Sequence, residues 1–487
     1  MKYKWTVLTV TTIGVLMAGL DARIVIIGLP QVISALKADA EQGIWISQAY
    51  SLGSIAVLLI VGRLTDIFGR KRFYTVGFAT FTIGSALTSL ATDPMQVIIF
   101  RTLQGIGAGI VLTNSIVIIT DATPKGELGF SLSVNNLGFR VGAMAGLTLS
   151  GLILSLIGDW RALFYINVPI GIFGTLWAQK TIKETPPKEK ASRGCMDWVG
   201  FATFTAFITS LLLVLTFAAY GIPSETLTLF FATLTVAMLF CFVAYEKRCP
   251  SPLLDLGLFR IREFSGGIFA LLLNGIAWGA VLLLLSFYFQ LVVGLSPLEA
   301  GIRIVPFDIA FLIVGPIAGR LCDKFSHHPF TASGIILSSV SLYLFSTVGA
   351  STPYLTVAVF MALFGIGLGL FSSPNMSSVM SCVPANRRGI GSAVRSAFLS
   401  VGMAVSLNLA VLIISFKIPY VLVTQIASGY AATLPADKTL FLDALRSTYL
   451  WLAVLNALAI FPSLLRGKGS QVRAPDAEKP AELNAAM

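Results

Sequence analysis

The segment Gly62-Arg63-Leu64-Thr65-Asp66-Ile67-Phe68-Gly69-Arg70-Lys71-Arg72 separates two long apolar runs. Its first five residues have a counterpart 257 positions later, Gly319-Arg320-Leu321-Cys322-Asp323, which again closes a long apolar run. In each copy a glycine and an arginine precede a leucine, and an aspartate follows two residues later. Repetition at such a wide spacing indicates that the chain is built from two homologous halves.

A second pair of segments keeps almost the same spacing. Gly105-Ile106-Gly107-Ala108-Gly109 recurs 260 positions later as Gly365-Ile366-Gly367-Leu368-Gly369. These glycines lie inside apolar runs with no strand before them, so they favour close helix packing over a dinucleotide-binding loop. The predicted organisation is an N-terminal six-helix bundle (1–180), a linker with two inserted transmembrane helices (181–263), a C-terminal six-helix bundle (264–466) and a disordered cytoplasmic tail (467–487).

The composition excludes a soluble protein. Of the 487 residues, 56% are hydrophobic and 12% are charged, whereas about 25% are charged in soluble globular proteins. The apolar runs are continuous and about 20 residues long, as membrane-spanning helices require. We therefore predict an all-α polytopic membrane protein with fourteen spans, near residues 6–30, 44–62, 73–92, 95–120, 130–157, 163–180, 198–219, 225–245, 264–290, 303–320, 330–349, 354–380, 389–415 and 447–465.

The basic residues predict the orientation of these spans, because basic loops are retained on the cytoplasmic side of a membrane. With the N-terminus inside, 24 of the 34 Lys and Arg residues fall on cytoplasmic segments and six on the opposite side. The net charge of +11 is then mostly a topology signal, and a nucleic-acid partner is not expected. We predict a multi-pass protein of the cell membrane with both termini cytoplasmic.

A few charged residues lie inside the predicted spans, where an ionised side chain costs about 2.5–3.5 kcal/mol on insertion scales and therefore faces a partner or a pathway. They are Asp21, Arg23, Arg101, Arg140, Asp308 and Arg395. Asp21 and Arg23 point to nearly opposite helix faces, so each needs a separate partner. A desolvated carboxyl can bind and release a proton as its surroundings change, which predicts Asp21 as a proton carrier. The alternative is a permanent ion pair that locks two helices together.

Several segments resemble the major facilitator superfamily and, within it, the fourteen-helix drug/proton antiporters. Residues 62–72 resemble the signature cytoplasmic loop of the superfamily, and residues 20–30 resemble the first-helix motif of the antiporters. Residues 101–107, 160–171 and 252–260 also fit that family. The resemblance covers nearly the whole chain and implies a major facilitator fold, two six-helix halves that move against each other to give alternating access.

The resemblance also suggests roles for individual charged residues. Arg101 matches a fourth-helix arginine implicated in proton coupling, although snorkelling to the outer surface is an alternative. The helices of Arg140 and Asp308 are neighbours across the interface in the family fold, which predicts an ion pair between the halves; alternatively, Arg140 faces a cavity alone and binds an anionic substrate. We assign proton coupling to Asp21, Arg101 and Asp308. Substrate binding or charge pairing is assigned to Arg23, Arg140, Asn136 and Arg395, and snorkelling is the other interpretation of Arg395.

Two further motifs concern the movement of the halves. Each aspartate of the repeated loop is placed to meet the N-terminus of a helix from the other half, which would close an inner gate. The predicted gating residues are Gly62, Asp66, Gly69, Arg70, Gly319 and Asp323. In the family's antiporter motif the chain has Gly142, Gly146, Leu147 and Gly151, and Leu147 replaces the proline that kinks this helix. That departure leaves the coupling mode open.

These features predict a secondary transporter that exports amphipathic compounds or drugs in exchange for protons. The spans contain two acidic residues and four arginines, and this excess of positive charge favours a negatively charged group on the substrate. An anionic or zwitterionic amphiphile, such as a lipid, fatty acid or siderophore, is therefore a competing substrate class. A receptor that keeps the scaffold without transport is a further alternative. No catalytic constellation, metal-ligand cluster or Walker loop occurs in the sequence, so we expect no enzyme activity, no metal, no cofactor beyond the proton gradient and no ATPase subunit. The expected partners are the small substrate, protons and the lipid bilayer.

Overall fold

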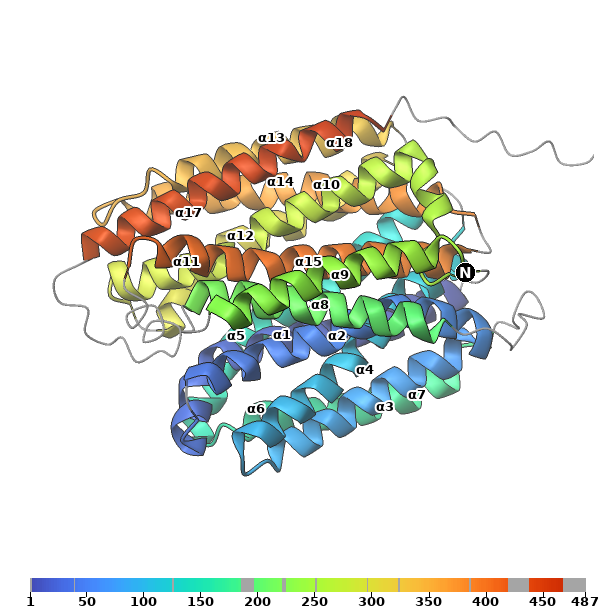
Figure 1. Cartoon of the computed structure of the whole chain (residues 1–487), viewed down its shortest axis with the longest axis horizontal. Coiled ribbons are helices and arrows are strands. Elements are labelled where there is room, and N and C mark those ends of the chain that lie inside the picture. The colour runs from blue at the N-terminus through green and yellow to red at the C-terminus, as the bar shows by residue number, and fades with distance from the viewer. Residues whose placement is uncertain are drawn as a thin grey trace, which may run out of the picture.

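The computed structural model describes residues 2–38, 40–124, 127–184, 197–220, 225–249, 252–295, 297–322, 325–384, 387–418 and 438–466. Every regular element within these ranges is helical. The long helices run roughly side by side along the longest axis of the molecule, as Figure 1 shows. The predicted tail and part of the linker lie outside the described residues.

The first half of the chain forms one helical bundle. Its elements are α1 (Lys2–Leu36), α2 (Ala40–Phe68), α3 (Arg70–Ser89), α4 (Pro94–Ala122), α5 (Leu128–Ile157), α6 (Ala162–Tyr165) and α7 (Asn167–Thr181). The end of the bundle at which α1 begins also carries Arg70 and Lys180, and we call it the basic end.

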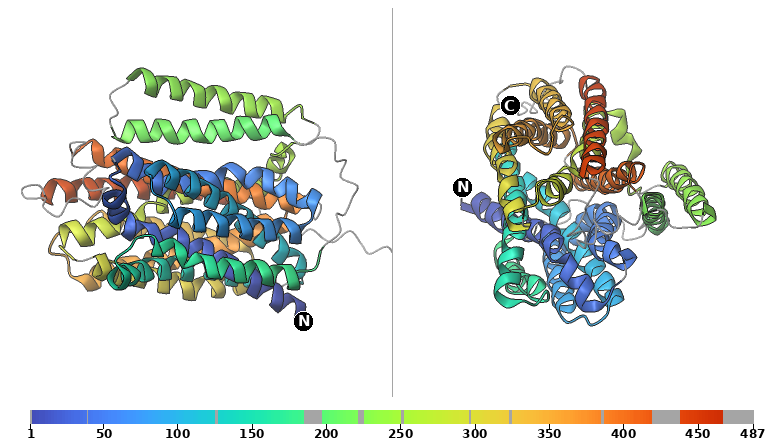
Figure 2. Two further views of the ribbon diagram at one scale, coloured as in Figure 1. Left: turned by 90° about the horizontal axis from the view of Figure 1, so that it is seen from below. Right: turned by 90° about the vertical axis from the view of Figure 1, so that its left-hand side faces the viewer.

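The second half repeats this arrangement. Its elements are η1 (Leu256–Arg260), α10 (Arg262–Trp278), α11 (Val281–Phe287), η2 (Tyr288–Val292), α12 (Pro297–Cys322), α13 (His327–Phe345), α14 (Tyr354–Ser381), α15 (Arg388–Ser415), α17 (Lys438–Leu458) and α18 (Ile460–Leu464). Between the halves, α8 (Trp198–Tyr220) and α9 (Glu225–Glu246) form a hairpin that stands at the side of the bundles in Figure 2. This hairpin is the predicted pair of inserted helices.

Helix occupies each of the fourteen predicted stretches. Among the described residues, twelve helical segments are both long and apolar enough to cross a membrane. The two long helices outside that set are α2, with 29 residues, and α3, with 20 residues. At about 1.5 Å per residue, each is as long as the roughly 30 Å of a bilayer core. The chain is thus a multi-pass, all-helical membrane protein with twelve candidate spans.

The repeated glycines lie where helices cross at close range. A Cβ atom on Gly105 of α4 would lie 2.0 Å from the carbonyl oxygen of Tyr50 in α2. The equivalent Gly365 of α14 faces Phe307 of α12 in the same way, with 2.3 Å between the added Cβ and the carbonyl oxygen. The prediction that these glycines serve helix packing is therefore confirmed, and the two halves use it at equivalent crossings.

Buried apolar contact between the two halves is concentrated at the basic end. One cluster joins Met376 of α14 to Leu132 of α5, and another joins Ile60 of α2 to Val394 of α15. The clusters nearest the opposite end are each confined to a single half. The structure therefore has its halves packed together at the basic end.

Replacing Gly105 with alanine tests the glycine crossings. We expect Gly105→Ala to cost about 1–3 kcal/mol of unfolding free energy, because the added methyl group overpacks the α2–α4 contact. The matched control is Gly301→Ala in α12, where an added Cβ would meet nothing within 4 Å. Thermal unfolding of the purified protein in detergent measures both, and equal melting temperatures for the two variants would contradict the packing role.

Candidate functional site

Asp21 lies at the centre of a buried polar cluster inside the first half. Its side chain is fully buried in α1, and its Oδ2 atom accepts a hydrogen bond from Arg101 Nη1 of α4 at 2.5 Å. Its Oδ1 atom accepts one from Gln104 Nε2 at 2.8 Å and one from Asn167 Nδ2 of α7 at 2.7 Å. Three donor side chains from two helices, α4 and α7, thus bind one carboxylate, as a buried charge requires.

Arg101 is held as firmly as its partner. Its side chain is 1% exposed, and its guanidinium carbon lies 4.7 Å from the ring centroid of Tyr50 and 5.6 Å from that of Phe164. Nη1 also donates to Gln104 Oε1 at 2.7 Å. The snorkelling interpretation of Arg101 is therefore wrong. Because aromatic rings enclose this ion pair, water cannot solvate either charge if the other is removed. The stability of the pair therefore depends on both charges being present.

The hydrogen bonds of this cluster match an ionised Asp21. With Asp21 ionised, both carboxylate oxygens are satisfied by donors. A proton on Asp21 would remove the charge that Arg101 faces and turn one acceptor into a donor. Protonation would therefore weaken the contacts that hold α1, α4 and α7 together at this place.

Asp308 pairs with Arg23 across the interface between the halves. The distance between Arg23 Nη1 of α1 and Asp308 Oδ2 of α12 is 4.0 Å, and both side chains are largely buried. Asp21 and Arg23 thus have different partners, as their spacing predicts. The predicted Arg140–Asp308 ion pair is not formed within the described structure. Arg140 lies within electrostatic range of Asp308, but Arg23 is the cation in contact with it.

Arg140 is instead enclosed by aromatic rings from the other half. Its guanidinium carbon lies 4.0 Å from the ring centroid of Phe311, 4.6 Å from that of Trp278 and 5.6 Å from that of Phe307. Its Nη1 atom is buried and has no hydrogen-bond partner. Cation–π contact stabilises the charge, but it leaves the hydrogen-bonding capacity of that nitrogen unused.

The residues at this interface carry a net positive charge. Arg23 and Arg140 bring two cations against the single carboxylate of Asp308. Arg23 Nη1, Arg140 Nη1 and Asp308 Oδ1 are all buried without a hydrogen-bond partner. We call Arg23, Arg140 and Asp308 the interface triad. Hydrogen-bonding capacity is therefore left unused at a buried place between the halves.

The other two predicted cavity residues lie elsewhere along the interface. Asn136 Nδ2 of α5 donates to Ser372 Oγ of α14 at 3.2 Å and so bridges the halves. Arg395 of α15 is 5% exposed, and its Nε atom has no hydrogen-bond partner. Because a snorkelling side chain would reach water, that interpretation of Arg395 is wrong.

The predicted gating loops can be followed in part. The surroundings of Gly62, the side chain of Asp66, and residue Asp323 lie outside the described part of the chain. Gly69 has a φ of +93° and forms the whole turn between α2 and α3, a conformation that favours glycine. A Cβ on Gly319 would lie 2.3 Å from Ser133 Oγ in α5, so the end of α12 does meet the beginning of a helix from the other half.

An ion-pair bridge that the sequence did not reveal joins the halves at the basic end. Arg70 of α3 pairs with Asp121 at the end of α4, and Arg388 of α15 lies 3.8 Å from the same carboxylate. Asp121 therefore receives one cation from each half. Asp121 is not part of the repeated loop motif, so the sequence did not predict its position between the two arginines.

The glycines of the antiporter motif form the contact between α1 and α5. A Cβ on Gly142 would lie 2.0 Å from the carbonyl oxygen of Leu16, and one on Gly146 would lie 2.4 Å from that of Leu20. Gly151 lies further along the same helix, and the side chain of Leu147 is outside the described structure. α5 runs without interruption through this region. The motif therefore positions the α1 segment that carries Asp21 and Arg23.

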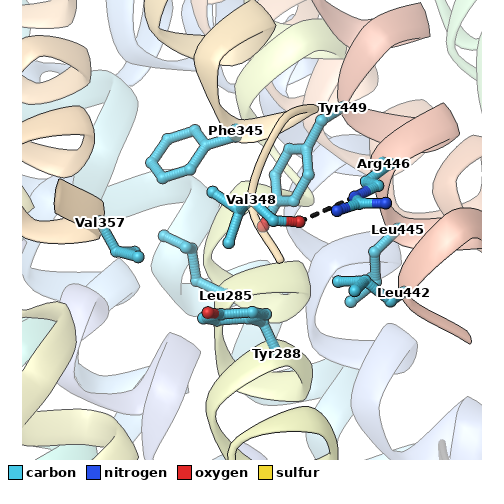
Figure 3. A pocket seen from close by; sticks show the side chains of 9 residues that line it. All are labelled: Leu285, Tyr288, Phe345, Val348, Val357, Leu442, Leu445, Arg446 and Tyr449. Atoms are coloured by element: carbon cyan, nitrogen blue, oxygen red, sulfur yellow. Dashed lines mark hydrogen bonds between the residues drawn. The ribbon is translucent and has the colours of Figure 1, made fainter. Parts of the chain in front are cut away.

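A small cavity lies away from these charges, inside the second half. Figure 3 shows its lining, in which Arg446 Nε donates to the carbonyl oxygen of Val348 at 2.8 Å. Tyr288 and Tyr449 contribute aromatic walls, and the other lining side chains are mostly aliphatic. This cavity belongs to the packing of one bundle and does not touch Asp21 or the interface triad.

Comparison with known proteins defines the class. Residues 11–407 match the family model of the Major Facilitator Superfamily. A riboflavin transporter, RibZ of Clostridioides difficile (strain 630), is 32% identical over 392 residues, which is 80% of this chain and 84% of the relative. The chain therefore belongs to the Major Facilitator Superfamily, whose members are transporters and not enzymes.

Other relatives and solved structures agree with this assignment. The tetracenomycin C resistance and export protein of Streptomyces glaucescens is 28% identical, covering 82% of this chain and 73% of that protein. Multidrug resistance protein 3 of Bacillus subtilis (strain 168) is 27% identical, with coverage of 82% and 77%. The human organic anion transporter MFSD10 has the same fold, with a TM-score of 0.65 at 15% identity and coverage of 94% and 99%.

Residues that sequence reasoning missed are mostly uncharged. Gln104 and Asn167 bind Asp21, and Trp278 covers Arg140. Gln104 lies one helical turn after Arg101, so the spacing alone predicts that the two side chains lie on the same helix face. Asn167 and Trp278 carry no such signal, because their partners come from other helices.

Proposed function

We propose that this protein is a fourteen-span drug/proton antiporter of the cell membrane, with both termini cytoplasmic. On this proposal α2 and α3 are spans, and the basic end faces the cytoplasm, as the distribution of Lys and Arg favours. The observation that carries the proposal is the buried Asp21–Arg101 pair, a titratable group whose charge is balanced in only one protonation state.

In the proposed cycle the ionised pair stabilises the state that is closed at the basic end. Substrate leaves and a proton reaches Asp21 from the outer side, after which the pair is weakened and the halves open inward. Loss of the proton to the cytoplasm, with substrate binding, returns the halves to the first state. Neither a cofactor nor an ATPase subunit is needed, because the proton gradient supplies the energy.

The interface triad supports a substrate class within this proposal. Its net positive charge and the rings around Arg140 favour an anionic or zwitterionic amphiphile with a planar ring over a cationic drug. The similarity to a riboflavin transporter supports a planar ring system, whereas similarity to multidrug resistance proteins supports a broader range. We therefore place anionic amphiphiles first and other amphipathic drugs second.

Transport in proteoliposomes tests the proton coupling. With an acidic lumen imposed, the wild type is expected to accumulate a fluorescent anionic amphiphile, and Asp21→Asn is expected to lose at least about 90% of this rate, because a side chain that cannot ionise cannot carry a proton. Asp443→Asn, which changes an exposed carboxylate near the opposite end, is the matched control and should transport normally. Gradient-driven transport at the wild-type rate by Asp21→Asn would refute the coupling role.

The same vesicles test the substrate class. We expect Arg140→Gln to raise the KM for the anionic amphiphile about tenfold or more, because one buried charge-assisted contact is worth roughly 1.5–3 kcal/mol. Transport of a fluorescent lipophilic cation should not weaken in this variant. If the wild type moves only the cation, or if Arg140→Gln affects both probes equally, the anionic preference is wrong while proton antiport stands.

A further inference from the structure

Two acidic residues lie at the ends of the inserted hairpin, away from the interface triad. Asp197 immediately precedes α8, and Glu246 is the last residue of α9. Each is only 3% exposed, although Lys247 and Arg248, which follow directly in the chain, are exposed. Carboxyl groups are rarely buried this completely without a cation beside them.

Each carboxyl group uses one oxygen to hold a backbone amide. Asp197 Oδ1 accepts the N–H of Gly200 at 2.6 Å and so caps the beginning of α8. Glu246 Oε2 accepts the N–H of Leu254 at 3.3 Å, in the linker that leads to η1 and α10. The two side chains thus fix the start of the hairpin and the segment that follows its end.

The remaining two oxygens have no donor. Asp197 Oδ2 and Glu246 Oε1 are buried without a hydrogen-bond partner within the described structure, and the two carboxyl groups are in contact with each other. Asp197 is also the one charge that acts on Glu246 there. An acceptor facing an acceptor is satisfied only when a proton lies between them.

Among the residues that the structure describes, no cation forms an ion pair with Asp197 or Glu246. In η1 and its approach, Asp255 is paired with Arg387, and at the beginning of α15 Arg388 is paired with Asp121. Further along α15, Arg395 has no electrostatic partner among the described residues. On the remaining side the pair is covered by apolar residues, including Leu253 and Leu254. Two carboxylates in contact at a buried place cannot both be ionised.

We propose that Asp197 and Glu246 bind one proton between them and form a second proton-binding site, separate from Asp21, that fastens the inserted hairpin to the linker of the second half. The shared proton supplies the missing donor and removes one charge. Its loss leaves two buried negative charges in contact, which separates the end of α9 from the start of α8 and releases the N–H of Leu254. The contact between the hairpin and the linker therefore depends on this proton, and it does not depend on what the protein transports.

The sign of the pH effect follows from proton counts. In the unfolded chain both carboxyl groups are ionised above about pH 5, whereas the folded pair keeps one proton. Because the folded state then binds more protons than the unfolded state, stability falls as pH rises, until the folded pair has lost its proton. Replacing Glu246 with glutamine supplies a permanent N–H donor to Asp197 and should remove this dependence.

Infrared spectroscopy of the purified full-length protein tests the proposal directly. The wild type is expected to show a carboxylic-acid C=O band that disappears at alkaline pH and is absent in both Glu246→Gln and Asp197→Asn. Asp255→Asn, in the same linker, is the matched control and should keep the band. A band unchanged in both variants, or the absence of any protonated acid that they remove, would overturn the shared proton.

Thermal unfolding gives a second readout that is independent of transport. Between pH 6 and pH 9 the melting temperature of the wild type should fall more than that of Glu246→Gln, which keeps the volume of the side chain. Equal pH dependence in the two proteins would also contradict the proposal. Because neither measurement uses a substrate or a gradient, failure here leaves the proposed antiport untouched, and failure of antiport leaves this site untouched.

Discussion

A charge placed where water cannot reach must be balanced by the protein itself, and the Asp21–Arg101 ion pair imposes this constraint on the whole first half. The carboxylate draws donors from α4 and α7, and the aromatic rings of Tyr50 and Phe164 enclose the guanidinium. Glycines in the α1–α5 and α2–α4 crossings bring these helices close enough for the contacts to form. The close helix crossings and the ion pair therefore depend on each other.

A second set of charges works between the halves rather than within one of them. At the basic end Asp121 receives Arg70 from its own half and Arg388 from the other, and apolar clusters at this end combine both halves. Deeper in the interface, the Arg23–Asp308 pair and the stacked Arg140 leave a net positive charge with unsatisfied hydrogen-bonding atoms. The interface therefore combines apolar packing at the basic end with buried charges deeper inside, and the proposed cycle requires both sets of contacts to separate and form again.

The sequence identified functional or packing residues where a residue type is unusual for an apolar, membrane-spanning segment. Charges inside apolar runs mark Asp21, Arg101 and Asp308, and repeated glycines mark the helix crossings, because neither is expected in an ordinary lipid-facing span. The partners of these charges could not be predicted, since they depend on which helices are neighbours: Asp308 meets Arg23 and not Arg140. Asn167 and Trp278 were missed because a neutral polar or aromatic residue is common in membrane helices. The acidic pair of the inserted hairpin was missed because its members are 49 positions apart.

The central claim is that the charge on Asp21 determines the end at which the halves meet. Spin labels at Leu156 of α5 and Leu355 of α14, both exposed near the end opposite the basic one, report the separation of the halves there. After the five native cysteines are replaced, double electron–electron resonance in lipid gives the distance distribution for the wild type and for Asp21→Asn. The account predicts that Asp21→Asn, like the wild type at acidic pH, shifts to shorter distances than the wild type at alkaline pH. Identical distributions for the two proteins at alkaline pH would contradict it.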